Sequence, residues 1–138
     1  MTFIHEYAHF LDNRVLHSLR REYASRYDSD FDPLLETCHR SRAVYDLSRI
    51  LKKHRRLLSP VQIAFLTESQ EPQELFARAY TQWVCSKSLN FQLQFSLKRR
   101  IAARMPFVRE FARIQWDPED FADIMGELEI LLRKKGLL

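Results

Sequence analysis

The chain has 138 residues, 46% of them hydrophobic and 29% charged, which is the balance of one globular domain and not of a disordered segment. Its two glycines and five prolines are too few for the many tight turns of an all-β protein, so helices are favoured. A net charge of +4, two cysteines and no long apolar run argue against a disulfide-rich or membrane protein, and we expect a cytoplasmic chain without membrane contact.

Two long helices are predicted in the first part of the chain. Apolar residues spaced three and four apart predict a helix over residues 3–27. Asp32 followed by Pro33 is typical of a helix start, because aspartate caps the free N–H groups and proline suits the first turn. The apolar pattern that follows predicts a helix over residues 32–55.

The middle of the chain contains two more helix starts. Ser59 and Pro60 predict a short helix over residues 61–66, and the polar residues 67–71 predict a loop. Pro72 opens a further helix. Residues 91–97 alternate apolar and polar side chains as a strand does, but they continue into a helix-compatible segment that ends at Met105, so we favour a helix.

A short helical piece is predicted after Pro106, followed by one clear final helix. Asp117 and Pro118 start that helix, with acidic residues in its first turn where the helix dipole favours them. Cations in the last turn and Gly136 end it near Lys135. The sequence therefore predicts a mainly α protein, a single-domain helical bundle over residues 1–138.

Residues 5–9 read His-Glu-Tyr-Ala-His, an H-E-x-x-H motif inside the first predicted helix. Side chains four residues apart lie on one helix face, so His5 and His9 can present ring nitrogens to the same tetrahedral ion. Glu6 is one residue further along, where its carboxylate can reach a water at the metal and act as general base. Chance can also produce this spacing, and the motif needs a third ligand.

A candidate for the third ligand comes from a second motif, which resembles a segment of a known family. Residues 74–80, Glu-Leu-Phe-Ala-Arg-Ala-Tyr, resemble the E-x-F-A-x-A-[FY] segment of gluzincin metallopeptidases, such as the anthrax lethal factor group and related phage and mobile-element peptidases. Residues 5–12 are similar to the H-E-[FY]-[GA]-H-x-[LV]-D segment of the same families. The resemblance implies a zincin-like fold and a Zn²⁺ cofactor with Glu74 as its third ligand. Glu71 is a competing ligand that the family pattern disfavours.

The resemblance also implies roles for three further residues. Glu6 corresponds to the general base, and Asp12 corresponds to an acidic residue that orients a ligand histidine. Tyr80 could donate a hydrogen bond to a transition-state oxyanion, although a buried aromatic side chain is the favoured interpretation.

The chain departs from complete zincins because its metal helix begins almost at the first residue. Such peptidases carry a preceding helix and a β-sheet whose edge aligns the substrate. We therefore expect an N-terminally truncated metallopeptidase in which an upstream segment or a partner supplies the sheet, or a domain that binds without cleaving.

The leading hypothesis is a zinc-dependent endopeptidase that hydrolyses a protein or peptide substrate. One alternative is an inactive, zincin-derived protein-interaction module. Another is a basic nucleic-acid-binding helical protein, suggested by cationic runs at residues 52–56, 98–100 and 133–135. Solvated helix faces explain these runs as well, so nucleic acid is not an expected partner.

Overall fold

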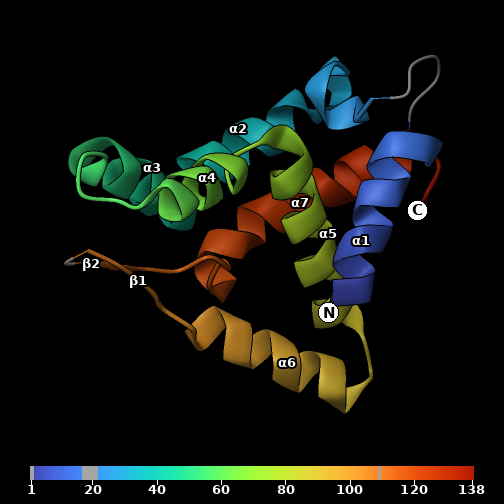
Figure 1. The fold of residues 1–138 in the computed structure, drawn as a ribbon. Coiled ribbons are helices and arrows are strands. Elements are labelled where there is room, and N and C mark those ends of the chain that lie inside the picture. Colours follow the sequence, from blue (N-terminus) through green and yellow to red (C-terminus); the bar gives the residue numbers. More distant parts are fainter. Residues whose placement is uncertain (1, 17–21, 109) are drawn as a thin grey trace.

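The computed structural model describes residues 2–16, 22–108 and 110–138 and has a mainly α fold, as predicted (Figure 1). None of the described helices is both long and apolar enough to cross a membrane. The described residues form seven α-helices and one antiparallel hairpin of two short strands. The helices are α1 (Thr2–Phe10), α2 (Asp32–Arg40), α3 (Arg42–His54), α4 (Pro60–Glu68), α5 (Pro72–Lys87), α6 (Phe91–Ala102) and α7 (Pro118–Lys134), and the strands are β1 (Met105–Phe107) and β2 (Glu110–Ala112).

Helix α5 is the centre of the bundle. It packs against α1, α2, α6 and α7, and Figure 1 shows α1 lying alongside it in the antiparallel direction. A helix with neighbours on most sides must bury most of its surface. The buried side chains of α5 accordingly occur all round it and include both apolar and polar residues: Leu75, Phe76, Ala77, Arg78, Ala79, Thr81, Gln82 and Cys85.

Two apolar clusters stabilise the fold. The larger one joins α1, α2, α5 and α7 and contains Phe31, Phe76 and Trp116, each fully buried. The smaller one joins α3 and α4 to the hairpin, through residues that include Leu47, Leu66 and Phe107. The larger cluster positions α1 on α5, and those two helices carry the predicted metal ligands.

The predicted helix starts at Ser59, Pro72 and Asp117 are confirmed, but Asp32 does not cap α2: Phe31 precedes the helix, and no side-chain cap hydrogen bond forms there. Ser59 and Gln62 form a reciprocal capping box at the start of α4, and the Asp117 side chain accepts a hydrogen bond from the Asp120 backbone N–H at the start of α7. The segment with alternating polarity is helical, as favoured, in α6. The chain turns after α7 at Gly136, whose φ of 72° suits a residue without a side chain.

The single helix predicted over residues 3–27 is wrong. Helix α1 ends at Phe10, a π-helical turn spans Leu11–Val15, and a separate 3₁₀ turn spans Ala24–Arg26, while residues 17–21 lie outside the described residues. Asp12 accepts hydrogen bonds from the Ser25 backbone N–H at 2.8 Å and from the Ser25 hydroxyl at 2.6 Å. A continuous helix would hold these two residues about 20 Å apart, so this contact requires the chain to fold back.

The single helix predicted over residues 32–55 is also wrong, because it breaks between α2 and α3. Ser41 has an extended backbone, and its hydroxyl accepts hydrogen bonds from the Val44 N–H and from the Trp116 indole N–H. The Asp120 carboxylate accepts hydrogen bonds from the backbone N–H groups of Arg42 and Ala43 at 2.9 and 3.0 Å. Caps that come from a distant segment stabilise the break, and local periodicity cannot reveal them.

The short helical piece predicted after Pro106 is wrong as well, because β1 and β2 form a hairpin there. Pro106 pairs with Phe111, and Phe107 pairs with Glu110. Phe107 is buried in the smaller apolar cluster, where its ring stacks on Phe65 at 6.3 Å. Burial of this aromatic side chain outweighs the local helical preference.

The larger apolar cluster provides a test of the packing. Ile124 of α7 is fully buried, whereas Ile130 of the same helix is 58% exposed. We expect Ile124→Ala to lower the free energy of unfolding by about 2–5 kcal/mol, because it leaves a cavity in the core. Urea denaturation measures this loss, and Ile130→Ala is the control that should cost far less. Equal losses for the two variants would contradict the packing described here.

Glu110 connects the hairpin to α3, since its carboxylate contacts His54 at 2.8 Å, Lys53 at 2.9 Å and Arg49 at 2.6 Å. Hydrogen bonds from these side chains, His54 first, lower the Glu110 pKa from 4.5 to about 2. A lowered carboxyl pKa contributes stability above pH 4.5 that is lost as the pH falls towards 2.

We therefore expect Glu110→Gln to lower the thermal midpoint at pH 7, with a difference from wild type that shrinks between pH 4.5 and pH 2. Scans of thermal unfolding across this range measure the effect. Glu36→Gln, an exposed change on α2, serves as the control. If the difference between the two thermal midpoints stays constant with pH, the ion pairs of Glu110 are not its cause.

Candidate metal centre

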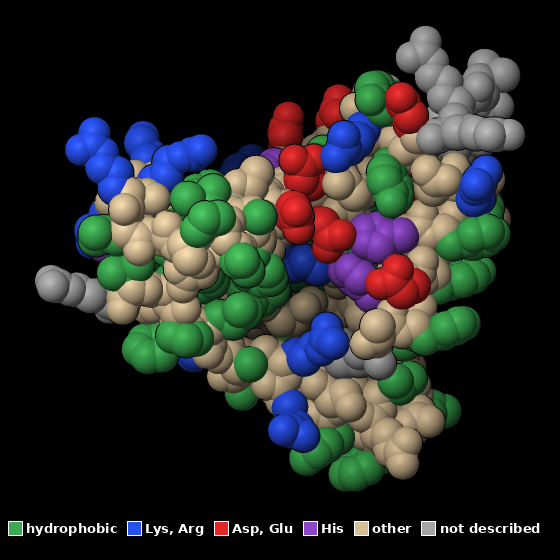
Figure 2. Space-filling model, viewed as in Figure 1, with side chains coloured by type: hydrophobic (Ala, Val, Ile, Leu, Met, Phe, Trp, Pro, Cys, Tyr) green, Lys and Arg blue, Asp and Glu red, His purple; other side chains and the backbone are tan. Residues whose placement is uncertain are grey.

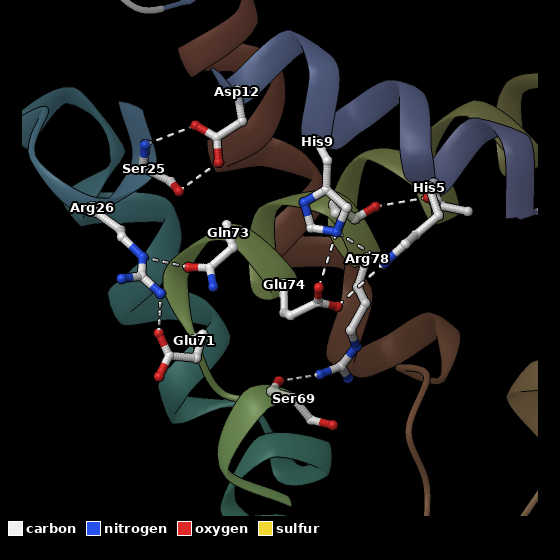
Figure 3. A network of polar contacts seen from close by, with 12 residues as sticks. His5, His9, Asp12, Ser25, Arg26, Ser69, Glu71, Gln73, Glu74 and Arg78 are labelled. Atoms are coloured by element: carbon white, nitrogen blue, oxygen red, sulfur yellow. Dashed lines mark hydrogen bonds and ion pairs between the residues drawn. The ribbon is translucent and has the colours of Figure 1, made fainter. Parts of the chain in front are cut away.

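His5, His9 and Glu74 lie together, as the two motifs predicted (Figure 3). His5 and His9 are one turn apart on α1, and Glu74 is in the first turn of α5. The His9 Nε2 atom is 2.9 Å from Glu74 Oε1, and the His5 Nε2 atom is 3.3 Å from Glu74 Oε2. The two Nε2 atoms are 3.2 Å apart. These three side chains could hold a metal ion.

The spacing of the three donors fits zinc. A tetrahedral zinc ion with bonds of 2.0–2.1 Å places its ligand atoms about 3.4 Å apart. Here the two Nε2 atoms are 3.2 Å apart, and each contacts a different oxygen of the Glu74 carboxylate, at 2.9 and 3.3 Å, so the three side chains would move slightly apart to admit the ion. Two imidazole nitrogens and one carboxylate oxygen are also a set that zinc accepts in proteins, with a fourth position left open.

The electrostatics of the site depend on the same contacts. Hydrogen bonds from His5 and His9 lower the pKa of Glu74 to about 2, against the opposing effect of its partial burial. The hydrogen bond to Glu74 raises the pKa of His9, while desolvation opposes this shift. Glu74 is ionised at neutral pH, which is the form in which a carboxylate binds a metal ion.

A short segment fixes the two ligand-bearing helices relative to each other. Asp12, just beyond α1, is held by Ser25, as described above. The next residue, Arg26, donates a hydrogen bond to Gln73 at 2.9 Å and forms an ion pair with Glu71 at 2.6 Å (Figure 3). Gln73 and Glu71 are one and three residues before Glu74. The segment thus ties the end of the histidine helix to the start of the glutamate helix.

Asp12 is therefore positioned to stabilise the end of α1. Both of its carboxylate oxygens accept hydrogen bonds from Ser25, and burial raises its pKa. Its negative charge contributes to the raised pKa of His9. The ring nitrogen Nδ1 of His9 is buried without a hydrogen-bond partner among the described residues. Orientation of a ligand histidine by Asp12 stays a prediction.

Glu6 and Glu71 lie in different surroundings. Glu6 is exposed on α1, and its charge is close enough to raise the pKa of His9, which suits a carboxylate that acts beside the metal. Glu71 is paired with Arg26 and is not part of the three-residue cluster. The geometry thus favours Glu74 over Glu71 as the third ligand.

Tyr80 lies on a different side of α5 from Glu74. Six residues along a helix correspond to a rotation of about 120° away from the starting side chain. The Tyr80 ring packs against Tyr7 at 6.5 Å, Phe76 at 6.1 Å and Trp83 at 5.8 Å. These contacts support the interpretation of Tyr80 as a packing residue, and its role towards an oxyanion stays a prediction.

Sequence reasoning missed Arg78, one turn after Glu74 on α5. Its guanidinium donates hydrogen bonds to the Ser69 carbonyl at 2.9 Å and to the Ile114 carbonyl, and it lies 4.5 Å from the centre of the Trp116 ring. Burial lowers its pKa to about 10, so it remains charged at pH 7. The four-residue spacing from Glu74 was the available signal, because such residues share a helix face.

Comparisons of this chain with protein-family models, with curated proteins and with solved structures give no match. The function must therefore be inferred from the geometry and chemistry of the site.

Metal binding is the first property to test. We expect the purified chain to bind about one zinc ion, and His5→Ala or Glu74→Ala to lower the affinity at least tenfold, because each removes one of three ligands. Inductively coupled plasma mass spectrometry after dialysis measures the metal content. His39→Ala, an exposed change on α2, is the control. A zinc content unaffected by both ligand variants would place the metal elsewhere.

Proposed function

We propose that this chain is a zinc-dependent metallopeptidase that hydrolyses a peptide bond in a protein or peptide. The observation that carries the proposal is the cluster of His5, His9 and Glu74, in which the two Nε2 atoms are 3.2 Å apart and each lies within 3.3 Å of an oxygen of the Glu74 carboxylate. Its spacing suits zinc, and it joins two motifs that resemble those of gluzincin peptidases. We infer that the ion held there is Zn²⁺.

The proposed chemistry divides between the ion and one glutamate. Zinc in a three-ligand site polarises a carbonyl group and makes water acidic enough to become a nucleophile at neutral pH. Glu6 directly follows His5 and is exposed on α1, where a substrate can approach. We assign to its carboxylate the removal of the proton from the attacking water and its delivery to the leaving amine.

A second candidate function is binding of a protein partner without cleavage. Phe3, Tyr7 and Phe10 form an exposed aromatic row on α1, and they are 80%, 43% and 52% exposed. Their rings follow one another at 6.5 and 6.0 Å. An apolar row of this kind commonly meets another protein surface. It lies on the helix that carries both histidines, so a partner bound there would adjoin the site.

Glu6→Gln tests the peptidase proposal. We expect the variant to retain its zinc and to lose at least 100-fold in the rate of peptide cleavage, because a general base typically contributes a factor of that size or more. Cleavage of a mixed peptide library, followed by mass spectrometry, measures the rate, with Glu36→Gln as the control for a remote loss of charge.

The result for the zinc-loaded wild type separates the two functions. Cleavage that survives in Glu6→Gln would remove the assigned role of this residue. A wild-type chain that holds one zinc but cleaves no peptide would refute the peptidase proposal and favour partner binding.

A further inference from the structure

A small cavity opens beside the three candidate ligands. Its volume is about 170 Å³, and His5 and Glu74 form part of its lining. Figure 2 shows histidine side chains at the edge of a hollow, with Lys or Arg side chains on its other rim. Pockets for whole small molecules usually measure about 300–1,000 Å³. The cavity is thus of a size to receive a single side chain of a longer substrate.

The lining of the cavity is cationic. Arg78 of α5 and Arg100 of α6 both contribute to it, and among the described residues that line it Glu74 is the only acidic one. Glu74 is already engaged by the two histidines. Within the described residues, no carboxylate lies at ion-pair distance from either guanidinium. Two positive charges therefore line this space, from the buried Arg78 and the exposed Arg100, and neither forms an ion pair within the described residues.

Arg78 is the informative member of the pair. It is 5% exposed, and its two terminal nitrogens are held by the Ser69 and Ile114 carbonyl groups. Its Nε atom is buried and has no hydrogen-bond partner among the described residues. A purely structural role would account for the two terminal nitrogens. The Trp116 ring and the nearby Glu74 charge also favour the charged guanidinium, but the buried Nε donor without a partner is unfavourable and remains unexplained by a structural role.

We propose that this cavity binds a carboxylate of the substrate, so that the site selects an acidic side chain, Asp or Glu, next to the bond at the metal. Planar guanidinium groups match carboxylates in both charge and hydrogen-bond geometry. A free C-terminal carboxylate offers the same chemistry from another source. The statement about cleavage rests on the proposed function, whereas the selection of a carboxylate is testable by binding alone.

The binding test uses the zinc-loaded Glu6→Gln variant and short fluorescein-labelled peptides with an amidated C-terminus. The peptides are identical except for one central residue, Glu or Gln, and a third peptide carries Gln with a free C-terminal carboxylate. Fluorescence anisotropy gives each dissociation constant. We expect the Glu peptide to bind at least tenfold more tightly than the amidated Gln peptide. Tighter binding of only the free-terminus peptide would assign the carboxylate to the substrate C-terminus.

Charge variants on α6 identify the cavity as the source of this preference. Arg100→Glu should bring the ratio of the affinities for the Glu and Gln peptides close to one. Arg99 is also exposed but does not line the cavity, so Arg99→Glu should leave this ratio unchanged. Arg78→Gln should act like Arg100→Glu if circular dichroism shows that it folds. The proposal is overturned if the Glu and Gln peptides bind equally, if neither binds, or if Arg99→Glu reduces the ratio as much as Arg100→Glu does.

Cleavage of the same peptides by the wild-type chain separates the two proposals. Tighter binding of the Glu peptide without any cleavage would leave the carboxylate pocket standing and refute the peptidase. Cleavage of Glu and Gln peptides at equal rates, with equal affinities, would support the peptidase and refute the pocket.

Discussion

The contact between the carboxylate of Glu74 and the two histidines of α1 is the interaction on which the candidate site depends. It joins α1 to the central helix of the bundle, and it lowers the pKa of the Glu74 carboxyl to about 2. In the absence of an ion, the carboxylate accepts hydrogen bonds from the two imidazole rings. With a dication present, the same three side chains could become its ligands, because the two ring nitrogens and the carboxylate already face one another at distances near those between zinc ligands.

That geometry is maintained by contacts that contribute no ligand. Asp12 and Ser25 hold the end of α1, and Arg26 holds the residues just before Glu74. A metal site requires its donors to be positioned within fractions of an ångström, so a supporting layer of hydrogen bonds is as necessary as the ligands. The buried Ala8 lets α1 approach the bundle closely, because its small side chain takes up little space between the helices.

Arg78 extends this arrangement to the other side of Glu74. It connects α5 to the end of α4 and to the segment before α7, and it also places a positive charge against the cavity beside the ligands. A buried guanidinium can serve both purposes at once, because its nitrogens point in different directions. The proposed metal site and the proposed carboxylate pocket therefore meet on α5, where Glu74 and Arg78 are one turn apart.

The sequence by itself determined the helical class, the start signals at Ser59, Pro72 and Asp117, and the identity of the three candidate ligands. The helix starts are local signals, and His5 and His9 are four residues apart, a spacing that a helix converts directly into a shared face. Glu74 was expected only from the resemblance of residues 5–12 and 74–80 to gluzincin segments. Only the tertiary structure decided where the helices over residues 3–27 and 32–55 would end, that residues 105–112 would form a hairpin, and that Arg78 would be buried. Each of these outcomes depends on a partner distant in the chain: Ser25 for Asp12, Asp120 for the break at Ser41, the smaller apolar cluster for Phe107, and Ile114 for Arg78. Local periodicity carries no information about such partners, because the free energy that they contribute arises only when the distant segments meet.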